Sequence, residues 1–464
     1  MCGIVGIAHH PDAARLAYLG LYALQHRGQE AAGIVTVDDA GIARTHRGMG
    51  LVSDVFNEDV IRSLDGTTAI GHTRYSTAGS SILVNSQPIL VRYRSGTLAV
   101  AHNGNLVNAD ELRRELVQAG SLFQSTMDTE AIVHLIARSA QPTPEAQLRE
   151  ALLRLDGAFS LVVTIGRVLF AVVDPRGFRP LLLGRVGDAP VVASESCALD
   201  IMGARHICEL EPGTVVRIEG SQVDYLEPLP PKPRTQCVFE LVYFSRPDSF
   251  VFGESVDLYR RGLGRQLAKE HPAPGADSVF SVPDSSNAAA LGYSEESGLR
   301  LEHGLIRNHY VGRTFIHPVQ AGRDAKVRIK YNAVREVVAG RSVVMVDDSI
   351  VRGTTSRGLV TMVRQAGARE VHFRVASPPT IGPCYYGIDT PTREELIAAT
   401  HSIEEIRRYL NVDSLGYLSL DGMVHASAGD PDRFCHACFS NQYPTPIPVD
   451  PAKLRLEAEP ARAR

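Results

Sequence analysis

The run VVMVDDSIVRGTTS at residues 343–356 constrains the fold more than any other segment of the chain. Its first four residues are apolar and predict a buried strand, and a helix with one apolar face is predicted to follow the run. A second apolar strand is predicted at residues 371–376. A strand, a loop, a helix and a strand in this order are typical of a parallel sheet with helices packed on it.

The loop in this unit combines two carboxylates with several hydroxyl groups. Thr354, Thr355 and Ser356 stand where the strand gives way to the helix. Their hydroxyls and the free backbone N–H groups at the start of the helix can therefore hold a phosphate. Asp347 and Asp348 cannot hold it, because like charges repel, but they suit sugar hydroxyls or a magnesium ion. The loop predicts a site for a phosphorylated sugar.

The N-terminal residues, MCGIVGI, indicate a second site. Removal of Met1, which the small side chain of Cys2 permits, leaves a cysteine with a free α-amino group. The ordinary pKa values of an α-amine and a thiol are about 8 and about 8.5, so the amine can carry the thiol proton without a separate histidine. The alternative is that Cys2 is a small hydrophobic residue at the start of a strand.

Longer segments resemble one known family. Residues 343–356 resemble the phosphoribosylpyrophosphate (PRPP) loop of type I phosphoribosyltransferases, in the form found in glutamine PRPP amidotransferases, the amidophosphoribosyltransferase family. The alternative is a generic strand-to-helix turn of an α/β protein. Further segments of the N-terminal part resemble the N-terminal-nucleophile glutaminase domain: LQHRGQEAAGI (24–34), GHTRYST (71–77), HNGNL (102–106) and MDTE (127–130). The resemblance extends over nearly all of residues 2–445.

The resemblance implies a protein with α/β and α+β parts. Residues 2–230 are expected to form a four-layer αββα glutaminase domain, and residues 237–445 a type I phosphoribosyltransferase domain with a parallel sheet. Between them, PLPPKPR at residues 228–234 has four prolines in seven positions, which excludes it from the interior of a helix or a sheet. Residues 446–464 are expected to form a charged, alanine-rich C-terminal tail.

Local patterns in the N-terminal part predict individual elements. One amphipathic helix is predicted over residues 13–24, and another begins at Asn108, where Glu111 is placed as the partner in a capping box. Two apolar runs at residues 158–165 and 168–173 are separated by two residues and predict a β-hairpin.

The glutaminase resemblance implies Cys2 as the nucleophile and gives roles to four further residues. Arg74 is expected to bind the α-carboxylate of glutamine through its planar guanidinium, and Asp128 its α-ammonium group. The Asn103 side chain and the Gly104 backbone N–H are expected to form the oxyanion hole. Taken singly, each has a simpler explanation as a surface arginine, a capping aspartate or an Asn-Gly turn. Their combination indicates the site.

The phosphoribosyltransferase resemblance implies a PRPP site with one Mg²⁺. SVPDSSNAAALGY at residues 281–293 resembles the pyrophosphate loop, in which Ser285 is expected to contact Mg²⁺ together with Asp347 and Asp348. The expected PRPP-binding residues are Asp347, Asp348, Ser349, Arg352, Gly353, Thr354, Thr355, Ser356 and Lys330. Residues 308–330 resemble the mobile loop that closes over PRPP. Their basic side chains, for which a solvated surface is the alternative, are Arg313, Arg323, Arg328 and Lys330.

The seven cysteines are an odd number, so a disulfide framework is not expected. Cys197 and Cys208 are interpreted as buried small hydrophobes. The spacing of a CxxC pair, Cys435 and Cys438, lets two thiolates share a metal site. Four thiolates suit either zinc or a [4Fe–4S] cluster. The resemblance to the iron–sulfur branch of the family favours one [4Fe–4S] cluster, with a structural role, on Cys237, Cys384, Cys435 and Cys438.

Composition limits the other functions open to the chain. Its 464 residues suggest more than one domain, and the net charge of −4, from 48 basic and 52 acidic residues, argues against general binding to nucleic acid or to a membrane surface. The apolar runs are shorter than the roughly 20 residues of a membrane span.

No signal peptide precedes Cys2, so a cytoplasmic location is expected. Many relatives with this cysteine set carry a short propeptide before the nucleophile.

The resemblance implies conversion of glutamine, PRPP and water to 5-phosphoribosylamine, glutamate and pyrophosphate, the first committed step of purine (IMP) biosynthesis. Ammonia is expected to pass internally between the two sites, because bulk water would protonate most of it at pH 7. Family members are commonly homotetramers inhibited by the purine nucleotides AMP and GMP, and both properties carry over as expectations.

Three alternatives share parts of this pattern. A glucosamine-6-phosphate synthase has the CGIVG start, but it would carry paired sugar-isomerase domains in place of residues 343–356. A PRPP-sensing regulator without activity would have a basic DNA-binding segment and no glutaminase residues. An enzyme with an inactive glutaminase would use free ammonia, but all the expected glutaminase residues are present. A glutaminase assay with and without PRPP separates the three.

Overall fold

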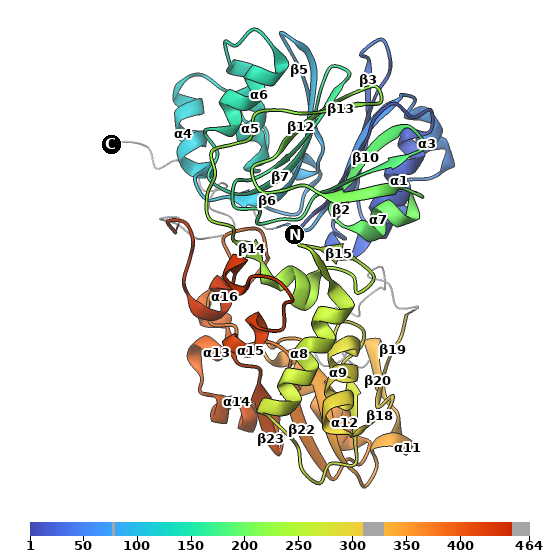
Figure 1. Ribbon diagram of the computed structural model, residues 1–464, viewed down its shortest axis with the longest axis vertical. Coiled ribbons are helices and arrows are strands. Elements are labelled where there is room, and N and C mark those ends of the chain that lie inside the picture. The colour runs from blue at the N-terminus through green and yellow to red at the C-terminus, as the bar shows by residue number, and fades with distance from the viewer. Residues whose placement is uncertain (77–78, 310–328, 448–464) are drawn as a thin grey trace.

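The protein, seen in a computed structural model, consists of two lobes stacked along the long axis, with the N-terminus at the level where they meet (Figure 1). The structure describes residues 1–76, 79–309 and 329–447. The upper lobe contains β1 through β13 with their helices, and the lower lobe contains α8 through α16 with the strands between them. The short elements between β13 and α8 lie at the junction of the lobes.

Two antiparallel sheets form the middle of the upper lobe. The first has the strand order β11 (Arg205–Glu209), β9 (Leu182–Val186), β10 (Ala189–Ala193), β1 (Gly3–Ile7), β4 (Thr68–Arg74), β2 (Ala31–Val37) and β3 (Ala43–Met49). The second has the order β13 (Gln222–Tyr225), β12 (Val215–Glu219), β8 (Val168–Val173), β7 (Gly157–Ile165), β6 (Gly96–Leu106) and β5 (Ile89–Tyr93).

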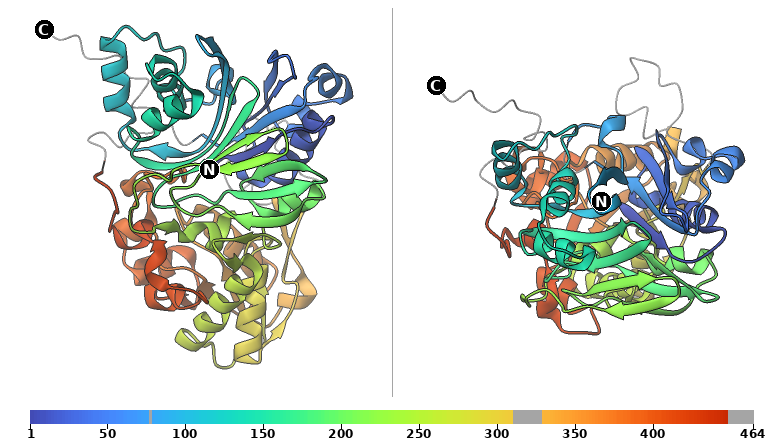
Figure 2. Two further views of the ribbon diagram at one scale, coloured as in Figure 1. Left: turned by 45° about the horizontal axis from the view of Figure 1, so that its top comes forward. Right: turned by 90° about the horizontal axis from the view of Figure 1, so that it is seen from above.

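Helices cover the outer face of each of these sheets, which gives the four layers (Figures 1 and 2). The helices beside the first sheet are α1 (Ala13–Ala23), α2 (Val52–Val55), α3 (Glu58–Ser63) and α7 (Ser196–Ile201). Those beside the second are α4 (Ala109–Gln118), α5 (Thr129–Arg138) and α6 (Pro144–Leu152). Apolar side chains from both sheets, such as Ile4, Ile70, Ala101 and Val162, are packed in one core between them. The four-layer αββα prediction is confirmed.

The lower lobe is built on a parallel sheet. Its strand order is β18 (Arg300–Leu301), β17 (Ser278–Ser281), β21 (Ser342–Asp347), β22 (Glu370–Val375) and β23 (Ser414–Tyr417). The helices of this lobe are α8 (Val256–Glu270), α9 (Asn287–Ser297), α11 (Arg335–Val338), α12 (Thr354–Gln365), α13 (Ile397–Thr400), α14 (Ile403–Leu410), α15 (Leu420–Val424) and α16 (Ala437–Ser440). The predicted strand, helix and strand are β21, α12 and β22, so the parallel α/β prediction is confirmed.

Shorter elements complete the fold. Two-stranded pairs are formed by β14 (Gln236–Cys237) with β24 (Phe434–Cys435), β15 (Phe250–Val251) with β16 (Glu254–Ser255), and β19 (Leu305–Arg307) with β20 (Tyr331–Ala333). The single-turn 3₁₀ helices are η1 (Gln25–Arg27), η2 (Leu83–Asn85), η4 (Arg393–Glu395) and η5 (Pro431–Arg433), and η3 (Glu240–Phe244) is a turn of π-helix.

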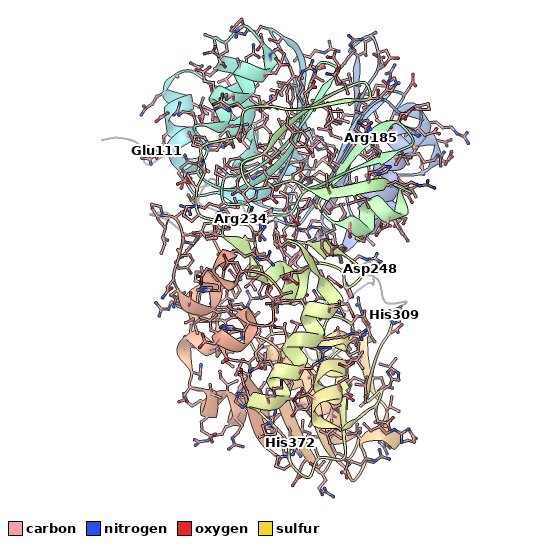
Figure 3. All side chains as sticks on the ribbon, in the orientation of Figure 1. Glu111, Arg185, Arg234, Asp248, His309 and His372 are labelled. Carbon is pink, nitrogen blue, oxygen red and sulfur yellow. The ribbon has the colours of Figure 1, made fainter. Side chains whose placement is uncertain are left out.

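The other local predictions can be compared with these bounds. The helix expected over residues 13–24 is α1, and the expected hairpin is β7 with β8. Helix α4 does follow Asn108, but the predicted capping box is wrong. The Asn108 side chain accepts a hydrogen bond from the Asp156 N–H and donates one to the Arg154 carbonyl, so it is not available to cap the helix. Glu111 is exposed on the outside of α4 (Figure 3).

The proline-rich segment at residues 228–234 lies in neither a helix nor a strand, as predicted for a connector. Its last residue, Arg234, is found near the junction of the lobes (Figure 3). Of the predicted C-terminal tail, residues 448–464 lie outside the described part of the chain. Within the described residues, no helix is both long enough and apolar enough to cross a membrane.

Glycines allow α8 and α9 to pack at close range. A Cβ atom on Gly264 would overlap the carbonyl oxygen of Ala289, and one on Gly292 would overlap the carbonyl oxygen of Arg261. By contrast, a Cβ atom on Gly262, which also lies in α8, would meet Ala426 at ordinary van der Waals distances of 3.4 Å or more. Gly262 and Gly264 therefore share the same helical backbone but differ in the atoms packed around them.

We expect Gly264→Ala to destabilise the protein and Gly262→Ala not to. Alanine favours a helix over glycine by about 1 kcal/mol, but overlap in a packed interface costs about 1–3 kcal/mol. The midpoint of urea unfolding should fall for Gly264→Ala and stay equal or rise for Gly262→Ala. Equal midpoints for the two variants would contradict this account of the α8–α9 contact.

Candidate functional site

Cys2 lies directly before β1 and is buried. The whole residue is 7% exposed to solvent. The backbone N–H of Cys2 donates to Asn103 Oδ1 at 3.1 Å, and its Sγ is 3.6 Å from the carbonyl oxygen of Tyr75. Because Asn103 is on β6 of the second sheet, this hydrogen bond joins the first sheet to the second at the expected nucleophile.

The second predicted oxyanion group, Gly104, follows Asn103 on β6. The Asn103 Nδ2 group is buried and has no hydrogen-bond partner within the described residues. A buried donor without a partner is unfavourable unless a ligand atom completes it. Gly104 has a φ of +153°, and a Cβ atom there would overlap the carbonyl oxygen of Ala158. The backbone at this position therefore requires glycine.

Arg74 and Asp128, the residues expected to hold glutamine, lie close to the same point. Arg74 ends β4 and is 1% exposed, with its Nη1 3.8 Å from Glu30 and its Nη2 3.5 Å from the Met127 sulfur. Asp128, at the start of α5, accepts a hydrogen bond from the Leu106 N–H at 3.0 Å. The structure brings together every predicted glutaminase residue. Thr77, the end of one motif, lies outside the described part of the chain.

His102, which was not singled out from the sequence, contacts Asp128 in this group of residues. Its Nδ1 lies 3.6 Å from Asp128 and 3.1 Å from the Thr129 hydroxyl. Burial acts to lower the pKa of His102, but the Asp128 carboxylate outweighs it and raises the pKa. In return, burial acts to raise the pKa of Asp128, but His102 lowers it. This mutual effect favours a charged Asp128, the form that attracts an ammonium group.

A second site lies at the carboxyl ends of β17 and β21 in the lower lobe, in a cleft of about 400 Å³. This is the edge of a parallel sheet at which ligands usually bind. Every residue predicted to bind PRPP or Mg²⁺ lines the cleft: Ser285, Lys330, Asp347, Asp348, Ser349, Arg352, Gly353, Thr354, Thr355 and Ser356. Three basic residues of the predicted mobile loop, Arg313, Arg323 and Arg328, lie outside the described residues.

The two carboxylates of the cleft are buried side by side. Burial and the neighbouring Asp348 raise the pKa of Asp347 well above its ordinary value, and burial also raises the pKa of Asp348. The Ser285 hydroxyl donates to Asp348, and the Ser349 hydroxyl donates to it at 2.6 Å. Two adjacent buried carboxylates with hydroxyl neighbours form a donor set that suits a hard divalent cation.

Helix α12 begins directly at the cleft. Its N-cap, Gly353, has a φ of +72°, which is a left-handed conformation that glycine adopts readily. The first turn, with Thr354, Thr355 and Ser356, therefore directs its N–H groups and the positive end of the helix dipole toward the cleft.

The lower cleft also has an aromatic wall, which was not identified from the sequence. Tyr75, Phe239, Tyr243 and Phe244 all line the lower cleft. The Tyr75 carbonyl is also the group next to Cys2 Sγ. The run FELVYF at residues 239–244 is rich in aromatic residues. Such runs usually belong to a hydrophobic core, so this one predicts a binding site only weakly.

The cysteines fall into two groups. Cys237, Cys384, Cys435 and Cys438 line one enclosed cavity at the junction of the lobes, together with Phe178 and Tyr386. Cys197 is buried, as interpreted from the sequence, but the same interpretation of Cys208 is wrong. Cys208 is exposed because it lies on β11, the edge strand of the first sheet.

Comparisons with known proteins agree with this geometry over the full chain. A family model described as the glutamine amidotransferase domain matches residues 72–200. The amidophosphoribosyltransferase of Archaeoglobus fulgidus is 49% identical over 457 residues, which cover 97% of this chain and 99% of that protein. The amidophosphoribosyltransferase of Bacillus subtilis is 48% identical over 454 residues, which cover 97% of this chain and 95% of that protein.

This chain belongs to the amidophosphoribosyltransferase family. The glutamine PRPP amidotransferase of B. subtilis, solved in complex with ADP and GMP, is similar with a TM-score of 0.91 and 47% identity, covering 97% of this chain and 98% of that one. A structure named as the allosteric regulatory enzyme of purine biosynthesis is similar with a TM-score of 0.93 and 47% identity, covering 99% of each chain. The predicted family and fold class are confirmed.

Proposed function

We propose that this enzyme, a transferase with a glutamine amidotransferase domain, releases ammonia from glutamine at Cys2 and joins it to C1 of PRPP. The products are 5-phosphoribosylamine, glutamate and pyrophosphate, and the reaction opens purine biosynthesis. One observation carries the proposal: Tyr75 lines the PRPP cleft while its carbonyl lies 3.6 Å from Cys2 Sγ. A single residue therefore separates a nucleophile from an acceptor site.

The glutaminase step follows from the contacts around Cys2. The thiolate attacks the side-chain amide carbon of glutamine, and the developing oxyanion accepts hydrogen bonds from Asn103 Nδ2 and the Gly104 N–H. Collapse of this intermediate releases ammonia and leaves a γ-glutamyl thioester, which water hydrolyses to glutamate. Once Met1 is removed, the Cys2 amine stays held at Asn103 Oδ1, where it can accept the thiol proton.

The acceptor step uses the groups of the lower cleft. The N–H groups and hydroxyls of the first turn of α12 hold the 5′-phosphate of PRPP. The fit of the donor set supports one Mg²⁺ on Ser285, Asp347 and Asp348, where it would neutralise charge on the pyrophosphate as it leaves. Lys330 and Arg352 supply further positive charge beside it. Ammonia is already nucleophilic and needs no strong base at C1.

We also propose that Cys237, Cys384, Cys435 and Cys438 hold a [4Fe–4S] cluster with a structural role. Burial, and after it the three other cysteines, raises the pKa of the Cys438 thiol, which is consistent with thiols gathered around one space. Within the described residues, no three histidine, cysteine or acidic side chains are placed to share a single metal ion. In a [4Fe–4S] cluster each sulfur binds a different iron atom, and the four thiols that line this cavity are the donor set that such a cluster needs.

Feedback by purine nucleotides is proposed as well. The similar B. subtilis enzyme was solved with ADP and GMP, which supports purine nucleotides such as AMP and GMP as ligands here. The homotetramer, the cytoplasmic location and the domain bounds at residues 2–230 and 237–445 stay predictions.

The two half-reactions should separate when Cys2 is changed. Cys2→Ala is expected to lower glutamine-dependent synthesis by at least about a thousandfold, because the nucleophile is lost. Synthesis from added ammonia should continue, since the PRPP cleft keeps all its groups. Cys197→Ala, which changes another buried cysteine of the same lobe, should leave both activities intact. Loss of both activities in a folded Cys2→Ala protein would contradict the proposal.

The acidic pair should control the acceptor site. Asp347→Asn combined with Asp348→Asn removes the charge that attracts Mg²⁺, so binding of PRPP with Mg²⁺ and ammonia-dependent synthesis should be lost. Asp277→Asn is the matched control, because Asp277 bonds to the Ser342 N–H at the opposite end of β21. Isothermal titration with Mg²⁺ and PRPP measures the difference. Normal binding by the double variant would refute the role of this pair.

Iron content should depend on four of the seven cysteines. Protein purified without oxygen is expected to be brown and to contain about four irons per chain. Cys438→Ser should lower both the iron content and the yield of folded protein, since the ligands join distant parts of the chain. Cys197→Ser and Cys208→Ser should leave the iron unchanged. One zinc per chain with full activity would show that the site is not a cluster.

A further inference from the structure

Arg179 is a buried arginine that belongs to neither of the two substrate sites described above. Its side chain is fully buried. Its Nε donates to the carbonyl oxygen of Tyr386 at 3.0 Å, and its Nη2 donates to the same oxygen at 2.5 Å. A carbonyl oxygen is neutral, so these bonds leave the charge of the guanidinium without a matching negative charge. A buried charge is costly unless another group balances it.

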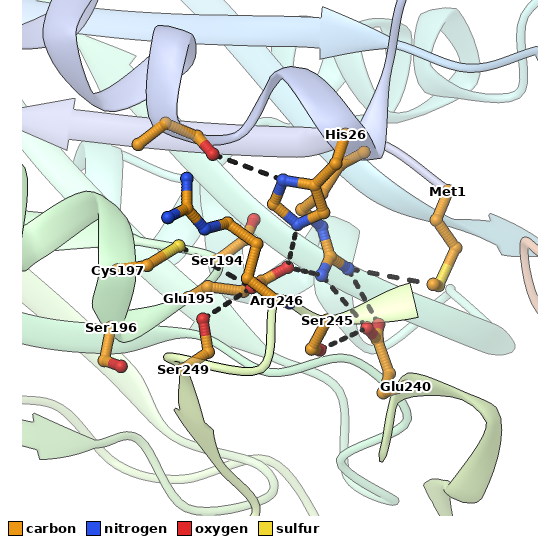
Figure 4. Close-up of polar contacts among 12 residues, drawn as sticks. Met1, His26, Ser194, Glu195, Ser196, Cys197, Glu240, Ser245, Arg246 and Ser249 are labelled. Atoms are coloured by element: carbon orange, nitrogen blue, oxygen red, sulfur yellow. Dashed lines mark hydrogen bonds and ion pairs between the residues drawn. The ribbon is translucent and has the colours of Figure 1, made fainter. Parts of the chain in front are cut away.

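Glu240 supplies only part of this balance. Its Oε1 lies 3.3 Å from Arg179 Nη1. The same carboxylate is bound more closely by Arg27, at 2.7 and 3.0 Å, and it accepts a hydrogen bond from the Ser245 hydroxyl at 3.1 Å (Figure 4). Arg27 pairs with Glu195 as well, but it remains the nearer partner of Glu240. Arg179 is therefore the more weakly paired of the two arginines at this carboxylate.

Arg179 also acts on the cysteines of the enclosed cavity. Tyr386, to which it is bonded, donates from its backbone N–H to Cys384 Sγ at 3.4 Å. Burial acts to lower the pKa of Arg179, but Cys237, then Glu240 and Cys384, raise it. Burial raises the pKa of the Cys237 thiol, and Arg179 opposes this rise. Both effects require the guanidinium to lie close to the thiols.

The residue before Arg179 belongs to the same cavity. Phe178 lines it, and the Phe178 carbonyl oxygen accepts a hydrogen bond from the Cys237 N–H at 3.2 Å. The Phe178 ring stacks on the Tyr386 ring, with their centres 4.4 Å apart. Residues 178–179 lie between β8 and β9 of the upper lobe, and these contacts fix them to the segments that carry Cys237 and Cys384. The guanidinium is therefore held at a set place beside the thiols.

We propose that Arg179 balances the negative charge of the [4Fe–4S] cluster and raises its reduction potential. The inference rests on the cluster proposed above and adds the residue that sets its electrostatic surroundings. Four thiolates on a [4Fe–4S] core carry a net negative charge, and reduction by one electron makes that charge more negative. Arginine stays protonated, so its positive charge is fixed. In buried surroundings this charge stabilises the reduced form more than the oxidised form, which makes the cluster harder to oxidise.

A purely structural role explains Arg179 less well. A neutral donor could make the bonds to the Tyr386 carbonyl without the cost of burying a charge. Arg374 of the lower lobe offers a comparison, because it is also buried and donates to backbone carbonyls, those of His271 and Pro272. There, burial lowers the pKa of the arginine. At Arg179 negative neighbours outweigh burial, and the thiols of the cavity are among them.

The test makes two measurements on full-length protein purified without oxygen and carrying its cluster. Reductive titration followed by electron paramagnetic resonance gives the midpoint potential, and loss of visible absorbance gives the rate at which ferricyanide destroys the cluster. In Arg179→Gln the potential should fall and the cluster should be lost at least about tenfold faster, because one buried charge is gone while a donor to the Tyr386 carbonyl remains. Arg179→Lys keeps the charge, so its potential should stay near the native value and its rate of loss within about twofold.

A second change should act in the opposite direction. Glu240→Gln removes the negative charge that partly balances Arg179, so the potential should rise and the cluster should be lost more slowly than in the native protein. Arg374→Gln is the matched control, because it removes a buried guanidinium whose bonds go to the residues directly after α8. Both measurements should stay at the native values in this control.

Native values of both measurements in folded Arg179→Gln would overturn the inference while the proposed cluster stands. Equal changes in Arg179→Gln and Arg179→Lys would also overturn it, because the effect would then come from the shape of the side chain rather than from its charge. If Arg179→Gln does not fold, the sign of the change in Glu240→Gln decides, and a fall in potential there would contradict the inference. Native protein without iron would overturn the proposed cluster, and the inference with it.

Discussion

The ion pair between Arg27 and Glu240 joins the two lobes at the point where both sites meet. Arg27 also bonds to the Cys2 backbone, and Glu240 begins the turn that lines the PRPP cleft. Because all these groups are buried, the contact can be broken only at the cost of leaving a charge without a partner. The positions of the nucleophile, of η3 and of the acceptor cleft are therefore not independent of one another.

This arrangement meets a requirement of the proposed chemistry. Ammonia attacks C1 only as the neutral base, and water at pH 7 would convert most of it to ammonium. The nucleophile is only 7% exposed, and the acceptor cleft shares with it the wall residue Tyr75, so the path between the two sites is short. At the far side of this wall, the start of helix α12 and the acidic pair supply the charges that the proposed PRPP and Mg²⁺ would need.

Much of the fold could be predicted from the sequence, because the decisive patterns are local. One stretch of chain contains β21, the loop and α12. The spacing of its apolar residues, together with its run of acidic and hydroxyl residues, identifies the acceptor cleft. The glutaminase residues are spread over four segments, and the resemblance was needed to bring Cys2, Asn103 and Asp128 together. The structure adds the reason, which is that β1 and β6 belong to facing sheets and meet at one end.

The remaining features could not be predicted, because they depend on contacts between distant residues. Arg27 is separated by 213 positions from Glu240, and charged residues in a sequence usually indicate surface. The capping box at Asn108 failed because Asp156, from another segment, donates to the same side chain. Cys208 is exposed because its strand is at the edge of a sheet, and an edge position is set by strand order rather than by the strand's own residues.

Isotope competition tests the central claim, that ammonia passes from Cys2 to PRPP inside the protein, most directly. The enzyme is supplied with PRPP, Mg²⁺, glutamine labelled with ¹⁵N in the side-chain amide, and unlabelled ammonium in excess at pH 7. The account predicts that the nitrogen of 5-phosphoribosylamine carries the ¹⁵N label far beyond its share of the total ammonia in solution. A product whose label equals that of the bulk ammonia would contradict it, because the ammonia would then have passed through water.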